Sequence, residues 1–132
     1  MNAEALQWLD YAGENLEMAR VGLERDLLNA SMQNAQQAVE KALKALLINS
    51  GNEISRTHSI RELARQVVAV GIPVDLAIEE CDLLDAIYIP SKYPVYGILP
   101  GEVANRDTCE SCLLIAERLI GKVRGCQVDP AS

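Results

Sequence analysis

The chain has 132 residues, of which 49% are hydrophobic and 23% charged, and its formal net charge is −7. This length fits one domain around a single core, and the composition excludes a disordered chain. The acidic excess excludes a protein that coats nucleic acid through bulk charge, and it argues against a nucleic-acid partner.

The sequence offers no segment for the membrane or for export. Its apolar runs are short, such as the four residues Ala45–Ile48, whereas a membrane span needs about 20. The first residues, Met1–Glu4, lack the basic and apolar regions of a secretory signal. We therefore expect a cytoplasmic protein without a membrane partner, whose four cysteines are reduced.

Two long helices are expected in the first part of the chain. One begins at an Asn2 cap and fades near Asp26, and the next runs from about Asn29 to a stop at Gly51. In both, apolar residues recur every three or four positions, which is the period of one helix face. In the second helix that face comprises Ala35, Ala38, Val39, Ala42, Leu43 and Leu46.

Two shorter helices follow. The segment Ser59–Glu62 has the spacing of a capping box, which predicts a third helix that begins at Ser59 and ends at Gly71. A fourth helix opens at Asp75, and Pro90 prevents its regular continuation because proline lacks an N–H and crowds the preceding turn. The inward residues of the fourth helix are Ala77, Cys81, Leu84, Ile87 and Tyr88.

For the last part of the chain, the sequence predicts a long loop followed by a fifth helix. The loop covers residues 90–101, the helix runs from about Glu102 to near Gly125, and residues 127–132 are a frayed tail. No segment shows the sustained alternation of a strand. The expected fold class is all-α, a four- to five-helix up-and-down antiparallel bundle that forms a single domain over residues 1–126.

Cys109 and Cys112 have the spacing of a redox or metal pair. A thioredoxin-type pair follows a strand, and a structural zinc site needs four ligands, usually in two pairs. Both cysteines instead lie on the apolar face of the fifth helix. That face also contains Ala116, Leu119, Ile120 and Val123. We therefore predict core packing for the two cysteines, with no metal and no cofactor.

The second helix also carries a polar stripe. The stripe comprises Gln33, Gln37, Glu40, Lys41 and Lys44. A solvated helix face is the ordinary interpretation of such a stripe. The alternative is a ligand site, in which cations hold a phosphate and an aromatic ring stacks on a base. The side chains that would converge there are Lys41, Lys44, Arg56, Lys92 and Tyr93.

His58 is the only histidine, so any acid–base chemistry by a histidine falls to it. It lies directly before Ser59, at the entrance to the third helix. One interpretation is a helix-entry residue whose ring nitrogen satisfies a nearby backbone group. The other is a member of the ligand site, and the sequence leaves both open.

At these residues the chain resembles the HEPN domain, a family of nucleotide-binding domains. The resemblance rests on Gln36–Leu46, Thr57–Ser59 and Ser91–Pro94, and it extends from about Ala3 to Val123. It implies a helical bundle that forms a homodimer and acts with a minimal nucleotidyltransferase, frequently as a toxin–antitoxin pair.

The resemblance also implies which residues bind a nucleotide. By position in the family pattern these are Gln37, Glu40, Lys41, Lys44, His58, Lys92 and Tyr93. Related sequences usually carry an arginine where this chain has Lys92. Lysine keeps the positive charge but lacks the two-pronged contact of a guanidinium group, which alters how a phosphate is held there.

One branch of the family consists of ribonucleases, in which four to six residues separate an arginine from the histidine that follows it, with a polar residue directly after the arginine. In this chain Arg56 is two residues before His58, and the next arginine upstream is Arg25. We therefore predict a non-enzymatic binding module without catalytic residues. The alternative is an endoribonuclease toxin in which His58 is the general acid–base.

Overall fold

Five α-helices make up the part of the chain that the computed structural model describes, residues 1–92 and 105–127. They are α1 (Ala3–Glu24), α2 (Leu28–Asn49), α3 (Ile60–Ala69), α4 (Ile78–Lys92) and α5 (Arg106–Gln127). Side chains are described over residues 1–88 and 105–125. Within these ranges no strand occurs, and no helix is long and apolar enough to cross a membrane. The predicted all-α bundle is confirmed.

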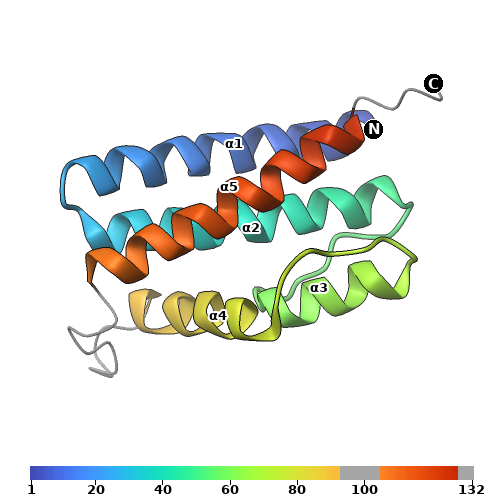
Figure 1. Cartoon of the computed structure of the whole chain (residues 1–132). Helices are drawn as coiled ribbons and strands as arrows, with labels where there is room; N and C mark the ends of the chain where they lie inside the picture. Colours follow the sequence, from blue (N-terminus) through green and yellow to red (C-terminus); the bar gives the residue numbers. More distant parts are fainter. Residues whose placement is uncertain (93–104, 128–132) are drawn as a thin grey trace.

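The central helix of the bundle is α2 (Figure 1). It contacts each of the other four helices, and 14 of its 22 residues are buried. Figure 1 shows α1 running antiparallel beside α2, α5 lying across both, and α3 with α4 along the opposite side. Because neighbours surround most of α2, its polar residues are buried as well unless they face the side that stays open.

The connection after α2 returns along the bundle. Residues 50–59 run back from the end of α2, so that α3 points in the same direction as α2 (Figure 1). This return brings His58 beside Glu40, which lies nine residues before the end of α2. At a rise of 1.5 Å per residue, the segment travels back by roughly 14 Å.

Two predicted helix caps are confirmed. Asn2 Oδ1 accepts a hydrogen bond at 2.8 Å from the N–H three residues further on, at the start of α1. Ser59 Oγ accepts one from the Glu62 N–H at 3.1 Å. Instead of a reciprocal bond between Glu62 and the Ser59 N–H, that N–H donates to Thr57 Oγ1 and Glu62 pairs with Arg65. One half of the capping box therefore starts α3.

The predicted glycine stops are confirmed as well. Shortly after α2 and α3 end, Gly51 and Gly71 have φ angles of 86° and 91°. Glycine enters this left-handed region without the steric cost that a Cβ would impose, so both glycines release the chain from the helix.

Both predicted boundaries of the fourth helix are wrong. It begins at Ile78 rather than Asp75, because the Asp75 carboxylate pairs with Arg118 and Lys122 of α5 instead of capping the helix. It also passes Pro90 and ends at Lys92. A proline removes one helical hydrogen bond, and two helical residues follow it in the described part of the chain, so the cost falls in the last described turn.

The fifth helix also differs from its predicted bounds. It begins at Arg106 rather than about Glu102, because Asn105 Oδ1 accepts a hydrogen bond from the Thr108 N–H at 2.8 Å and caps the helix there. It ends at Gln127 rather than near Gly125. The remainder of the predicted loop, 93–101, and of the predicted tail, 128–132, lies outside the described residues.

The two cysteines of α5 lie in the core, as predicted. Cys109 and Cys112 are fully buried among aliphatic side chains contributed by several helices. Burial raises the pKa of the Cys112 thiol to about 12, because a thiolate would lose its hydration there. The pair therefore acts as small apolar packing residues.

Candidate ligand site at His58

Three polar residues of α2 point into the bundle. Gln36, Glu40 and Lys44 are 1%, 8% and 5% exposed, respectively. Because they follow one another at intervals of four, they form one row along the helix. Trp8 of α1 and His58 of the returning segment lie over this row. The solvated-face interpretation is therefore wrong for Glu40 and Lys44.

The row contains a buried ion pair. Lys44 Nζ donates to Glu40 Oε2 at 2.9 Å, and the ammonium lies 5.9 Å from the centroid of the Trp8 ring. Gln36 Nε2 donates to the other carboxylate oxygen, Glu40 Oε1, at 3.3 Å. The positive charge of Lys44 is therefore balanced inside the protein.

The imidazole of His58 lies at the outer edge of this row. Its Nδ1 is 3.1 Å from Glu40 Oε2, and its ring is stacked on Tyr88 with centroids 5.0 Å apart and planes inclined by 17°. The side chain of His58 is 52% exposed. Its ring nitrogen thus meets a carboxylate instead of the backbone group of the helix-entry interpretation. Glu40 connects a buried cation to a ring that faces solvent.

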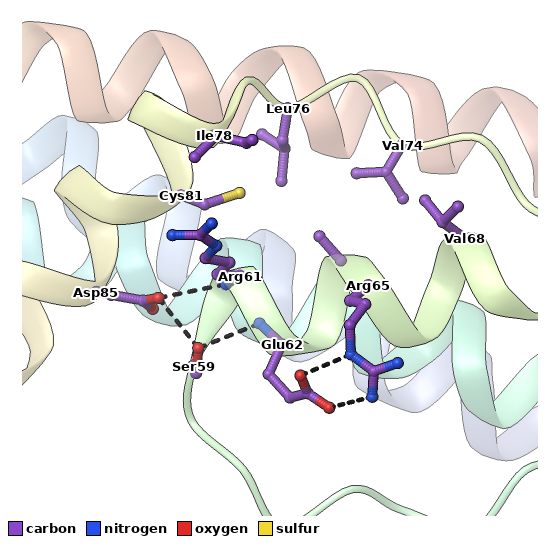
Figure 2. A pocket seen from close by; sticks show the side chains of 11 residues that line it. Ser59, Arg61, Glu62, Arg65, Val68, Val74, Leu76, Ile78, Cys81 and Asp85 are labelled. Atoms are coloured by element: carbon purple, nitrogen blue, oxygen red, sulfur yellow. Dashed lines mark hydrogen bonds and ion pairs between the residues drawn. The ribbon is translucent and has the colours of Figure 1, made fainter.

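A hollow of about 310 Å³ opens beside this ring, lined by His58, Ser59, Asp85 and Tyr88. Asp85 accepts three hydrogen bonds, from Ser59 Oγ at 3.0 Å and from the first two amides of α3 at 2.6 and 3.3 Å. Figure 2 shows this carboxylate turned toward the start of α3. Asp85 is thus an anion at a helix N-terminus, and it fastens α4 to α3.

Two other predicted site residues, Lys41 and Gln37, do not join this cluster. Lys41 Nζ donates to Asn15 Oδ1 of α1 at 2.7 Å, and Gln37 is half-buried on α2. The side chain of Lys92 and the whole of Tyr93 lie outside the described residues, so the convergence near Tyr93 stays a prediction. Three of the seven predicted residues meet in the described part of the chain.

Trp8, Gln36 and Tyr88 were not predicted as site residues. Gln36 precedes Glu40 by one helical turn, and this spacing places the two side chains side by side. Tyr88 belongs to the predicted inward face of the fourth helix, which is a signal for burial but not for contact with His58. Nothing in the sequence pairs Trp8 with Lys44, which follows it 36 residues later.

A second, larger hollow of about 580 Å³ lies between α3 and the segment that leads into α4 (Figure 2). Its apolar lining includes Val68, Val74, Leu76, Ile78 and Cys81. At its edge Glu62 pairs with Arg65 at 2.5 Å, and Arg61 pairs with Asp82 at 3.4 Å. The hydrogen bond from Arg65 lowers the pKa of Glu62 to about 2. The charged groups here are engaged with one another, which makes the His58 hollow the better candidate.

The chemistry open to the His58 site is that of an oriented imidazole. A ring that is held at one nitrogen can accept or donate a hydrogen bond at the other, or move a proton there. Among the described residues, no group of three or more His, Cys, Asp and Glu side chains could hold a metal ion.

Comparison with known proteins finds relatives over nearly the whole chain. The family model described as "HEPN domain" matches residues 5–126. The chain is 30% identical over 129 residues to "Putative toxin MJ1304" of Methanocaldococcus jannaschii, with 86% of this chain and 81% of that protein covered.

Two solved structures are similar as well. TT1696 from Thermus thermophilus is 30% identical, with a TM-score of 0.75 over 95% of this chain and 98% of that one. ST0689, described as an archaeal HEPN homologue, is 27% identical, with a TM-score of 0.66 over 92% and 95% of the two chains.

Proposed function

The chain belongs to the HEPN family, and on this premise we propose that it is the HEPN component of a toxin–antitoxin-type system. The support is the family match over residues 5–126 and the 30% identity to a relative that is named as a toxin. In this proposal the protein is a non-enzymatic module that forms a homodimer, binds a nucleotide and acts with a minimal nucleotidyltransferase. The dimer and the transferase rest on the family resemblance, and the nucleotide rests on the geometry at His58.

The position of His58 is the observation that carries nucleotide binding. Glu40 holds one ring nitrogen, Tyr88 covers one face of the ring, and about half of the side chain is exposed. Nucleobases are bound in proteins by stacking on rings and by hydrogen bonds to their polar edges, and this site offers both. The hollow of about 310 Å³ beside the ring is within the range of small-ligand sites.

Titration with ATP, GTP and their nucleosides tests this half of the proposal. We expect amide shifts to concentrate in residues 58–60 and 85–88. His58→Ala should weaken binding about tenfold, the effect of losing one hydrogen bond worth about 1.4 kcal/mol. Gln7→Ala, on the exposed face of α1, is the control and should bind normally. Shifts that avoid the His58 region, or no shifts at all, would reject nucleotide binding at this site.

Affinity purification from the native cell tests the partner. We expect a nucleotidyltransferase to be recovered with this chain under gentle salt, and we expect light scattering to give twice the chain mass of 14.4 kDa. Failure to recover a transferase would count against the partner. A mass of 14.4 kDa in solution would count against the homodimer.

A second candidate function is an endoribonuclease with His58 as general acid–base. The contact between His58 Nδ1 and Glu40 favours it, because catalytic histidines are commonly oriented by a carboxylate. The charge of the hollow argues against ribonuclease activity. Its described lining contains the anion Asp85 but no lysine or arginine, whereas cleavage of a phosphodiester develops negative charge. RNA cleavage by the purified protein that His58→Ala abolishes would establish this candidate and overturn the first.

A further inference from the structure

We propose that Glu40 is a positioning residue that holds neutral His58 with its proton on Nδ1, so that Nε2 presents a hydrogen-bond acceptor to the ligand. The starting point is the 3.1 Å contact between His58 Nδ1 and Glu40 Oε2. An ionised carboxylate only accepts hydrogen bonds, so the ring nitrogen that bonds to it must carry the proton. The other nitrogen of a neutral imidazole is then bare.

The partners of Glu40 exclude the opposite arrangement. Lys44 Nζ donates to the same oxygen at 2.9 Å, and Gln36 Nε2 donates to the second oxygen at 3.3 Å. An ammonium has only donors, so it keeps Glu40 ionised and in the accepting role. With Glu40 8% exposed, water cannot easily replace any of these partners. The carboxylate thus gathers three donors, of which the His58 N–H is the one that reaches the surface.

The ring itself has little freedom to turn. Tyr88 is stacked on one face of the ring, with the two centroids 5.0 Å apart. A 180° flip about the Cβ–Cγ bond of His58 would place a ring carbon, instead of Nδ1, opposite Glu40. That turn would leave a buried carboxylate with one partner fewer, which is unfavourable. The contact with Glu40 therefore determines both the orientation of the ring and the position of its proton.

The polarity of the hollow follows from the tautomer. Nε2 accepts, and Asp85 places a negative charge in the lining of the hollow, so the hollow matches ligand groups that donate. Exocyclic amines of bases and sugar hydroxyls are donors, whereas an ionised phosphate offers only acceptors and is repelled by Asp85. This step rests on the nucleotide binding proposed above, and it assigns the nucleoside end of the ligand to His58.

Nitrogen NMR reads the tautomer directly. His58 is the only histidine, so protein labelled with ¹⁵N-histidine gives one pair of ring signals. In spectra recorded at alkaline pH, we expect Nδ1 to resonate as a protonated nitrogen and Nε2 as an unprotonated one. The reverse pattern in the folded protein would overturn the role of Glu40.

The double variant Glu40→Met/Lys44→Met removes the acceptor together with its counter-ion. We expect His58 to revert to the Nε2–H form that free imidazole side chains prefer. The control is Arg106→Gln/Glu110→Gln, which removes an exposed i, i+4 ion pair of α5 together with the exposed contact of Arg106 with Asp26, and should leave the ring signals unchanged. An unchanged tautomer in the Met double variant would contradict the proposal. If that variant does not fold, the wild-type spectrum alone decides.

Adenosine and ATP separate the two ends of a nucleotide. We expect both to shift the His58 ring signals, because both carry the nucleoside, and we expect inorganic phosphate to leave these signals unchanged. Ring shifts that ATP and phosphate produce but adenosine does not would overturn the acceptor-type hollow. If neither ligand binds, the nucleotide-binding function fails, while the ring spectrum of the free protein still decides the role of Glu40.

Discussion

Removal of Lys44 alone should destabilise the protein far more than removal of the whole ion pair. In Lys44→Met the Glu40 carboxylate stays in place, 8% exposed, without its cation. Breaking a buried ion pair in this way costs about 3–5 kcal/mol. Gln36 and His58 remain as hydrogen-bond partners of Glu40 and offset roughly 1 kcal/mol, so we expect a loss of about 2–4 kcal/mol.

In the double variant Glu40→Met/Lys44→Met no buried charge is left among the residues that the structure describes. Replacing a buried ion pair by apolar side chains of similar length is often neutral or stabilising. Methionine also adapts to irregular space and makes favourable contacts with aromatic rings, here the ring of Trp8. We therefore expect a stability within about 1 kcal/mol of wild type.

Urea unfolding of both variants and the wild type in the same buffer measures these stabilities. With slopes of about 1–3 kcal/mol per molar urea, a loss of 3 kcal/mol lowers the midpoint by roughly 1–3 M. The control Arg106→Gln/Glu110→Gln removes the exposed pairs of Arg106 with Glu110 and Asp26 and should stay within about 1 kcal/mol of wild type, since exposed pairs contribute little. The reasoning is refuted if Lys44→Met loses less than about 1 kcal/mol, or if the double variant loses as much as the single one.

Four further outcomes are expected. Gly22→Ala should cost about 1–3 kcal/mol in thermal or urea unfolding, because a Cβ there would lie 3.1 Å from Ser31 of α2. Gly121→Ala, where a Cβ would meet nothing within 4 Å, should stabilise α5 by about 0.5–1 kcal/mol. Equal effects of the two substitutions would contradict the close approach of α1 to α2 at Gly22. Asp85→Ala should cost about 1–3 kcal/mol and speed hydrogen exchange at the Ile60 and Arg61 amides, and unchanged exchange there would show that Asp85 does not cap α3. Because the folded-state pKa of Glu62 is lowered to about 2, the ionised carboxylate stabilises the fold at pH values above the ordinary carboxyl pKa, and this contribution is lost as the pH falls toward 2. Arg65→Gln should raise the pKa of Glu62, as a ¹³C carboxyl titration would show. An unchanged pKa would show that a group other than Arg65 causes the shift. Cys109 and Cys112 should resist alkylation in the native protein and react after denaturation, as mass spectrometry of the modified peptides would show; rapid native modification would contradict their burial.

The helices and their ends were predictable to the extent that their signals are local. A cap depends on a side chain and an amide three residues away, as at Asn2 and Ser59, and a stop depends on the φ angle of one glycine, as at Gly51. The start of α4 was not predictable in this way. Asp75 has the chemistry of a cap, but two cations of α5, more than 40 residues further on, take up its carboxylate.

The candidate site was predictable only in part, for the same reason. The chain's one histidine and the polar stripe of the second helix could be singled out by residue type and spacing. Their contact could not, because it depends on the path by which residues 50–59 return along α2. Tyr88 contacts the imidazole only because α4 packs on the side of α2 along which the segment 50–59 returns.

The sequence by itself determined the helical class, most of the apolar faces, the caps at Asn2 and Ser59 and the family, since each of these depends on neighbours within one or two turns or on a short motif. Tertiary structure alone decided that Glu40 and Lys44 are buried and that Lys41 turns toward α1 instead. The physical reason is that a helical period states which residues share a face, whereas burial depends on which distant element covers that face. A carboxylate on α2 thus becomes the partner of an imidazole only when the fold brings the two together.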